Sequence, residues 1–247
     1  MSTMREQTGP QSVGSRPLYA QVREQLLQRI STGAWRPGQL IPNEFELARE
    51  MGVSQGTARK ALDSLAADGL LVRRQGRGTF VVEHTPSDML FRFFNLFDSD
   101  GNPIGPDSKS ARIVRAKATE VERKKLGLGA TDDVIKIARV RTRNNRPFIV
   151  ETLVLPASRF GLLEKLESIP NTLYDYFQKH FGITVARGDE RIQAVAAGRN
   201  QAKLLGVDEG APLLKLDRRM YDLDGNVIEW RVSVCHLGNA YYGVSLR

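Results

Sequence analysis

The 247-residue chain has little cysteine and no long apolar run, and both absences limit what it can be. Its single cysteine, Cys235, cannot form an intrachain disulfide, which argues against a secreted fold stapled by disulfides. No apolar run approaches the roughly 20 residues of a membrane span. The polar N-terminus lacks the apolar segment of a signal peptide. The sequence therefore predicts a cytoplasmic protein without membrane contact, in which residues 1–14 form a disordered leader.

Histidine is also scarce, and its distribution argues against catalysis. His84, His180 and His236 are scattered, and no serine–histidine–aspartate or cysteine–histidine order is recognisable. Cys235 and His236 are neighbours on a predicted strand and point to opposite faces, so they do not form a shared metal site. We expect no enzymatic activity, no metal and no cofactor.

The net charge of +8 is not concentrated in one half of the chain. Residues 1–85 contain 11 Lys/Arg and 8 Asp/Glu, a net charge of +3, and residues 86–247 contain 25 against 20, a net charge of +5. Such a charge is compatible with a polyanionic partner but does not establish one. A prediction of nucleic-acid binding must therefore rest on the local arrangement of residues.

Residues 15–83 show three short helical patterns followed by a hairpin pattern. Apolar residues at helical spacing, capping residues and breaks at glycine and proline define the helices, and a glycine-rich turn joins the strands. The expected elements are a helix over 17–32, a helix from Asn43 to about Glu50, a helix from Ser54, and strands over 70–74 and 79–82. This order predicts a winged helix-turn-helix DNA-binding domain.

Polar side chains gather at the start of the third helix and on the hairpin. Because the apolar face of that helix packs on the first two, its polar side chains remain available for base edges and phosphates in a major groove. The arginines of the hairpin can reach the flanking backbone or minor groove, and its glycines permit a close approach. The candidates are Ser54, Gln55, Gly56, Thr57, Arg59 and Lys60 on the helix, and Arg73, Arg74, Gly76, Arg77 and Gly78 on the wing.

Residues 84–107 differ from both neighbouring regions. Phe91, Phe93, Phe94 and Phe97 cluster there beside turn-forming residues. We interpret the segment as a linker and the start of a second domain, with the phenylalanines in a core rather than stacked on a ligand.

The second domain, expected over residues 108–247, contains a weak duplication that spans 126–151 and 205–229. Each copy reads as a helix ending in Leu-Gly, a strand, a turn and a returning strand. Arg139 of the first copy matches Arg218 of the second, and Glu151 matches Glu229. The repeat predicts two related helix-plus-hairpin units that share one antiparallel sheet, and so an α+β domain.

Four charged residues in these strands have two possible roles. Glu151 and Glu229 lie in apolar-rich strands, where an unpaired carboxylate is costly. Arg139 and Arg141 are two residues apart on one strand face and can form a fork for a phosphate or carboxylate. From the residues alone, internal salt bridges and a ligand site are both open.

The whole chain resembles the GntR family of transcription factors, in its HutC-like branch with a UTRA effector domain. The first half carries the resemblance in "PGQLIPNEFELAREMGVSQGTARKAL" and "RRQGRGTFV". The second half carries it in "RVRTRNNRPFIVETLVLP", "TLYDYF" and "LGVDEGAPLLKLDRRMYDLDGNVIEW". The resemblance implies a chorismate-lyase-like second domain, a homodimer, a small-molecule effector and a pseudo-palindromic operator in double-stranded DNA. It implies a repressor rather than an enzyme or a sequence-tolerant DNA binder.

The resemblance also implies particular contact residues. DNA contacts fall on Glu44, Phe45, Gln55, Gly56, Thr57, Arg59, Gln75 and Gly76. The family usually has arginine where Phe45 stands and commonly has arginine where Gln55 stands, so the usual operator is not expected. Effector contacts fall on Ser108, Arg139, Arg141, Glu151, Thr172 and Glu229, with Cys235 at a position that is often aromatic in relatives responding to sugar phosphates. The paired arginines favour an anionic metabolite.

Overall fold

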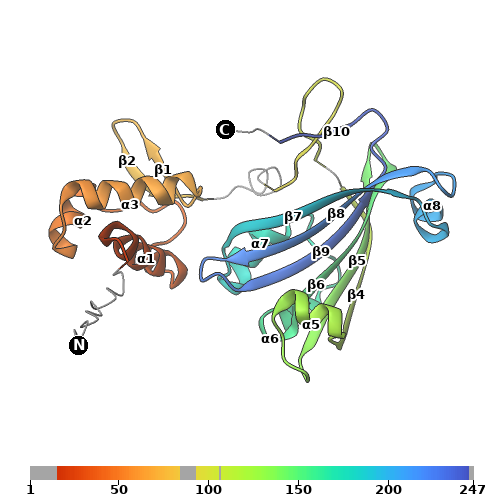
Figure 1. Cartoon of the computed structure of the whole chain (residues 1–247), viewed down its shortest axis with the longest axis horizontal. Helices are drawn as coiled ribbons and strands as arrows, with labels where there is room; N and C mark the ends of the chain where they lie inside the picture. The colour runs from red at the N-terminus through yellow and green to blue at the C-terminus, as the bar shows by residue number, and fades with distance from the viewer. Residues whose placement is uncertain (1–15, 84–92, 106, 245–247) are drawn as a thin grey trace, which may run out of the picture. The chain divides into compact units, whose positions relative to one another are not determined.

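The computed structural model describes residues 16–83, 93–105 and 107–244. Two compact units divide between Val81 and Val82 (Figure 1). The expected leader, His84 and Phe91 lie outside the described residues.

The N-terminal unit has the order of a winged helix-turn-helix. Its elements are α1 (Leu18–Ser31), α2 (Glu44–Met51), α3 (Gln55–Ala67), β1 (Leu71–Arg74) and β2 (Gly78–Val81). The two strands pair antiparallel and form the wing. Its core includes Val22 and Leu26 of α1, Leu47 of α2, and Leu62 and Leu65 of α3, all of them buried.

Capping residues set the helix-turn-helix geometry. Asn43 and Glu46 form a reciprocal capping box at the start of α2, as predicted. Gly52 ends α2 in the left-handed conformation, and the Ser54 side chain accepts a hydrogen bond from the Thr57 backbone at the start of α3. The turn between α2 and α3 is therefore short and closed at both ends.

Gly78 begins the second wing strand with a φ of +104°, in the region that favours glycine. A Cβ at this position would stand 2.6 Å from Cδ1 of Leu40. Leu40 in turn forms an isolated antiparallel bridge with Phe80. Gly78 therefore accommodates Leu40 within the unit, and its assignment to close approach of DNA stays a prediction.

The C-terminal unit is α+β and is built on a six-stranded antiparallel sheet of order β4-β5-β6-β9-β8-β7 (Figure 1). Its elements are β3 (Leu96–Phe97), β4 (Asp107–Lys117), α5 (Glu120–Leu126), β5 (Asp133–Arg143), β6 (Arg146–Pro156), α6 (Ala157–Phe160), the 3-10 helix η1 (Gly161–Lys165), α7 (Leu173–Phe181), β7 (Val185–Ala196), α8 (Arg199–Leu205), β8 (Pro212–Asp222), β9 (Val227–Cys235) and β10 (Tyr241–Tyr242). The short strands β3 and β10 form a second, two-stranded sheet.

The predicted duplication corresponds to two helix-plus-hairpin units, α5 with β5–β6 and α8 with β8–β9. Both helices end at a left-handed glycine, Gly127 or Gly206. The first hairpin turns through Asn144 and Asn145, which both have positive φ, as a tight turn between twisted strands requires. The two hairpins meet at the centre of the sheet, where β6 of the first pairs with β9 of the second.

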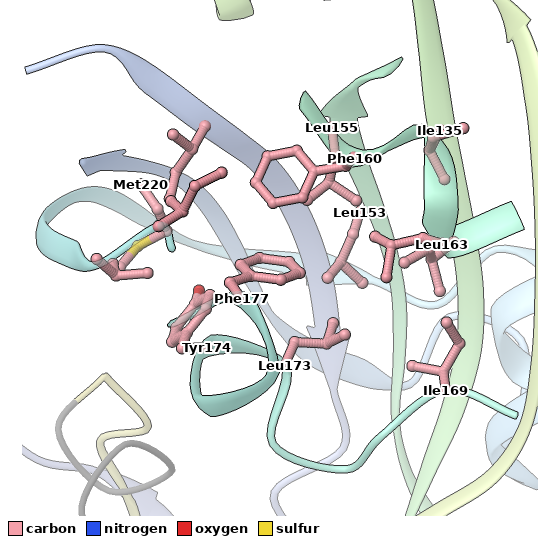
Figure 2. Packing of buried hydrophobic residues seen from close by; sticks show 14 of the residues in the cluster. Ile135, Leu153, Leu155, Phe160, Leu163, Ile169, Leu173, Tyr174, Phe177 and Met220 are labelled. Atoms are coloured by element: carbon pink, nitrogen blue, oxygen red, sulfur yellow. The ribbon is translucent and has the colours of Figure 1, made fainter. Parts of the chain in front are cut away.

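The main core lies between one face of the sheet and the segment α6–η1–α7. Leu153 and Leu155 of β6 pack against Phe160, Leu163 and Phe177 of the covering helices (Figure 2). On the other face, α5 and α8 cover separate small apolar clusters. Both faces of the central strands are therefore buried, and none of the helices in the described part of the chain is long and apolar enough to cross a membrane.

Candidate nucleic-acid interface and effector pocket

Glu44, at the start of α2, binds two side chains at the start of α3. Its carboxylate accepts hydrogen bonds from Gln55 Nε2 at 3.1 Å and from Arg59 Nε at 2.9 Å, and it also pairs with Arg59 Nη2. The hydrogen bond and charge of Arg59 lower the pKa of Glu44 below its ordinary value. Glu44 thus fixes Gln55 and Arg59 beside each other on the exposed side of the helix-turn-helix.

The remaining residues predicted at the helix starts divide into exposed and internally bonded groups. Phe45 is exposed and follows Glu44 on the first turn of α2. Gly56 is exposed, whereas the Ser54 and Thr57 hydroxyls bond each other at 2.9 Å and close the α3 cap. Lys60 places its ammonium 4.2 Å from the centre of the Tyr19 ring, which holds its stem on α1.

The wing arginines share a groove with the start of α2. Arg73 and Arg77 line it together with Glu44 and Gly78, and the open space measures about 970 Å³. Arg73 pairs with Asp63 of α3 at 2.6 Å. The other exposed wing residues lie outside this lining: Arg74, whose guanidinium lies 4.8 Å from the Phe80 ring, Gln75 and Gly76. The structure therefore brings α2, α3 and the wing together around one cationic and hydrogen-bonding surface.

A band of charged residues crosses one face of the large sheet between two apolar clusters. Cross-strand pairing aligns it: Arg139 stands opposite Glu151, Glu151 opposite Ser233, Arg218 opposite Arg231, and Glu190 opposite Arg218. We call the buried residues Arg139, Arg141, Glu151, Arg218, Glu229, Arg231 and Ser233, together with the half-buried Glu190, the ionic band.

Glu151 is the central carboxylate of the ionic band. It pairs with Arg139, lies 3.6 Å from Arg141 Nη1, and accepts a 3.0 Å hydrogen bond from Ser233. Arg231 Nη1 is 3.5 Å away on a third side. Burial by itself would raise the pKa of Glu151, but the surrounding arginines outweigh burial and hold this pKa far below its ordinary value. Glu151 is therefore ionised at neutral pH.

The other two glutamates are also paired internally. Glu229 accepts hydrogen bonds from Arg231 Nε at 2.8 Å and from the Tyr174 hydroxyl at 3.0 Å. Burial, aided by Glu229, raises the pKa of Tyr174, which stays protonated as a donor. Glu190 of β7 accepts a 2.6 Å hydrogen bond from Arg218. Glu151 and Glu229 are thus both paired internally, and their role as effector contacts stays a prediction.

The arginines, in contrast, line a pocket above the ionic band. Its open space is about 340 Å³, solvent at its mouth included, and its lining consists of Phe93, Phe94, Arg139, Arg141, Asn171, Thr172, Leu173, Tyr174, Arg218 and Arg231. Arg141 Nη2 donates to Asn171 Oδ1 at 2.6 Å, and burial lowers the pKa of Arg141 to about 10, so it remains cationic at neutral pH. Arg139 Nη1 is buried and meets no acceptor among the described residues.

Four of the expected effector residues lie outside this lining, namely the two paired glutamates Glu151 and Glu229, and Ser108 and Cys235. Ser108 lies in a neighbouring groove between β4 and η1, and its hydroxyl is 3.4 Å from Asn171 Oδ1. Cys235 is fully buried in an apolar cluster with Leu96, Ile149 and Leu216, where burial raises the pKa of its thiol. Cys235 shares the strand face of Ser233 but lies beyond the ionic band, so it does not reach the pocket.

Sequence reasoning missed several residues of the pocket. Phe93 and Phe94 were interpreted as core, and each packs half-buried against an apolar cluster, but both also line the pocket, with Phe93 edge-on to Tyr174 at 5.6 Å. Asn171 precedes α7 and carried no pattern. Arg218 had a signal, since the duplication matched it to Arg139, and Arg231 lies two residues after Glu229 on the same strand face.

A winged helix-turn-helix unit joined to a sheet domain with a buried cationic pocket defines a DNA-binding regulator with a ligand-binding domain. Comparison with known proteins gives the same class. The family "Bacterial regulatory proteins, gntR family" matches residues 18–81, and the UTRA domain family matches residues 104–241. The chain therefore belongs to the gntR family of bacterial regulators and carries a UTRA domain, which confirms the predicted family and its two-part α+β fold.

Individual relatives are similar to this chain over most of its length. The HTH-type transcriptional repressor NagR of Bacillus subtilis is 32% identical over 227 residues, 91% of this chain and 92% of NagR. The histidine utilization repressor of Pseudomonas putida is 32% identical over 209 residues, 84% of each protein. Among solved structures, PhnF from Mycobacterium smegmatis matches with a TM-score of 0.54 at 27% identity, over 92% of this chain and 99% of PhnF.

Proposed function

We propose that the chain is a cytoplasmic, homodimeric repressor whose affinity for a pseudo-palindromic operator changes when an anionic metabolite binds above the ionic band. Family membership supports DNA binding and a small-molecule effector. Repressors among the relatives support the sign of regulation. The regulatory family also supports a binding protein rather than an enzyme.

One observation carries the anionic part of the proposal, namely the charge of the ionic band. Within the band four arginines face three glutamates, an excess of one positive charge, and outside the band the carboxylate of Asp107 also acts on Arg141. An excess of buried positive charge is costly, and a bound anion would relieve it. Arg139, which lines the pocket, has a donor for such an anion in Nη1, which meets no acceptor among the described residues. A phosphate or carboxylate matches the planar donor arrangement of paired guanidinium groups.

The position of Phe93 and Phe94 suggests how an occupied pocket affects DNA binding. These two residues line the pocket, and only residues 82–92 separate them in sequence from the end of the wing at Val81. An effector that contacts the two rings therefore acts on the chain segment that leads to the DNA-binding unit. A differential affinity of about 1–3 kcal/mol between two conformations would change operator affinity some 5–150-fold.

The test is equilibrium binding of the purified full-length chain to the DNA upstream of its own gene, measured by fluorescence anisotropy. A scrambled duplex serves as the control at two salt concentrations. We expect preference for the native duplex to persist at the higher salt. Equal, salt-sensitive binding to both duplexes, or no binding to either at low salt, contradicts a specific regulator.

The same assay tests the charge of the effector. Metabolites are added in matched pairs that differ only in charge, such as hexoses with their 6-phosphates and alcohols with the corresponding carboxylic acids. We expect the anionic member of an active pair to change operator affinity and its neutral counterpart to have no effect. Equal effects of both members would contradict an anionic effector. Size-exclusion chromatography with light scattering tests the dimer, for which we expect twice the 27.6 kDa of the chain.

A further inference from the structure

Phe45 is an exposed aromatic residue with no role in the core of its unit. Its side chain is 63% exposed, more than any other large apolar side chain described in the N-terminal unit. Its backbone N–H completes the α2 cap by donating to Asn43, so the position contributes to the fold through its main chain. Phe45 follows Glu44 on the first turn of α2, and Glu44 holds Gln55 and Arg59. The exposed aromatic residue and the hydrogen-bonding groups of α3 thus meet in sequence at the start of α2.

The bond from Gln55 to Glu44 determines which groups Gln55 can offer to DNA. Nε2 donates one amide hydrogen to Glu44, which leaves the second hydrogen and the carbonyl Oε1. No residue of the described chain donates to Oε1. A donor beside an acceptor matches N7 and the N6 amino group of adenine. Guanine presents two acceptors, N7 and O6, so Oε1 would face O6 without a hydrogen between them.

We propose that Gln55 and Phe45 read A·T pairs in each half-site, Gln55 through an adenine edge and Phe45 through a thymine methyl group. The inference rests on the DNA-binding function proposed above. A phenyl ring cannot hydrogen-bond to a base edge or pair with a phosphate, but it buries a methyl group well. Arg59 keeps unbonded guanidinium hydrogens for a guanine or a phosphate beside these positions.

Glu44 acts in this arrangement as a positioning residue. It touches no base in the proposal, but its carboxylate selects the orientation of the Gln55 amide and restrains Arg59. Without Glu44, the Gln55 amide could rotate and offer two donors to guanine. Base preference at the Gln55 position therefore depends on Glu44, whereas the stability of the unit depends on it much less.

The adenine contact is tested by selection of binding sites from a duplex randomised over both half-sites, with the full-length chain and with Gln55→Arg. We expect the wild-type chain to enrich adenine at one position of each half-site and the variant to enrich guanine there. A matched pair of duplexes should then show a preference of about 5–150-fold that reverses between the two proteins. The same base selected by both proteins overturns the inference but leaves the proposed function standing. Failure of the wild-type chain to enrich any site overturns both.

The methyl contact is tested by replacing every half-site thymine with deoxyuridine, which removes the methyl group alone. We expect the wild-type protein to lose about three- to fourfold in affinity for each half-site, the value of one buried methyl group. Phe45→Ala should bind both duplexes equally, while Leu18→Ala, an exposed apolar residue of α1, should keep the wild-type difference. A wild-type difference that survives in Phe45→Ala removes Phe45 from the interface.

The positioning role of Glu44 is tested with Glu44→Ala on the same A·T and G·C duplexes. We expect its preference for adenine to fall toward equality while circular dichroism shows a folded wing and helix-turn-helix. An unchanged preference in a folded variant overturns the positioning role. Lost affinity for both duplexes at an unchanged ratio overturns it equally, since that result reflects Arg59 alone.

Discussion

Arg139 and Glu151 stand directly opposite each other on β5 and β6, and each side chain is 1% exposed. Glu151 uses its oxygens on Arg139, Arg231 and Ser233, while Arg139 lines the pocket and its Nη1 meets no acceptor among the described residues. Because only the arginine lines the candidate ligand site, substitutions of the two members should have different effects.

Glu151→Gln should destabilise the C-terminal unit. The substitution removes the carboxylate that Arg139, Arg141 and Arg231 surround, and leaves their charges buried. Loss of one partner from a buried pair costs about 3–5 kcal/mol. Urea unfolding followed by Trp230 fluorescence measures the change. Glu209→Gln, which removes an exposed partner of Arg199, is the matched control and should change stability by less than about 1 kcal/mol.

The free energy by which Glu151 stabilises the fold should decrease as pH is lowered. Because the folded pKa of Glu151 is held below its ordinary value of 4.5, its contribution is complete above that value and is lost as pH falls further. The difference in unfolding free energy between wild type and Glu151→Gln should therefore narrow as pH is lowered from about 7 to about 3.5. Other carboxylates titrate in both proteins and cancel. A difference in unfolding free energy that stays constant or grows on acidification contradicts the predicted direction of the pH dependence.

Arg139→Gln should abolish the response to effector while apo DNA binding remains intact. The variant keeps hydrogen-bonding capacity next to Glu151 but loses the guanidinium that faces the pocket. The expected 5–150-fold change of operator affinity with effector should disappear. Arg112→Gln, an exposed arginine of β4, should respond as wild type does. A normal response in Arg139→Gln would move the ligand site elsewhere.

Arg59→Ala should weaken operator binding without loss of the fold. Arg59 is exposed and bonds only Glu44 in the described structure, so its contribution to the core is small. Removal of a base or phosphate contact should lower affinity by about 1–3 kcal/mol. A phosphate contact would also reduce the slope of log affinity against log salt by about 1. Unchanged operator affinity at the same salt concentration would contradict the assignment of α3 to the DNA major groove.

Gly78→Ala should destabilise the N-terminal unit by about 1–3 kcal/mol. An added Cβ meets Leu40 at 2.6 Å, and the φ of +104° is unfavourable for alanine. The double variant Leu40→Ala with Gly78→Ala separates these causes, because it removes the collision but not the backbone strain. Thermal unfolding of the four variants in this cycle should show a coupling of at least about 0.5 kcal/mol. Additive losses would assign the whole effect to backbone conformation.

Local patterns made the elements of this fold predictable, because caps, turns and periodicity are encoded by adjacent residues. Asn43 caps α2 where a helix was expected to begin, Thr119 and Glu122 form a second capping box at the start of α5, and Asn144 and Asn145 form the turn of the first hairpin. The alternation of side chains along a strand also predicted that Arg139 and Arg141 share a face, since every second residue points the same way.

Register between strands could not be predicted in the same way. Arg231 reaches Glu151 because β6 and β9 pair at the centre of the sheet, a pairing of residues some 80 positions apart. Cys235 shares a strand face with Ser233. Only the position of the apolar cluster around Leu96 shows that this end of β9 is buried among apolar side chains rather than in the pocket. Because the pocket is assembled from several distant segments, no sequence pattern indicated that Asn171 and Phe94 line it.

The two hairpins of the duplicated domain differ in the residue that stands opposite their matched arginines. In the first copy an acidic residue, Glu151, opposes Arg139, while in the second copy Arg231 opposes Arg218. A glutamate in place of Arg231 would shift the ionic band by two charges, from a net positive to a net negative value. One substitution on this sheet could in this way exchange the proposed preference for anionic metabolites for a preference for cationic ones, with the strand pairing unchanged.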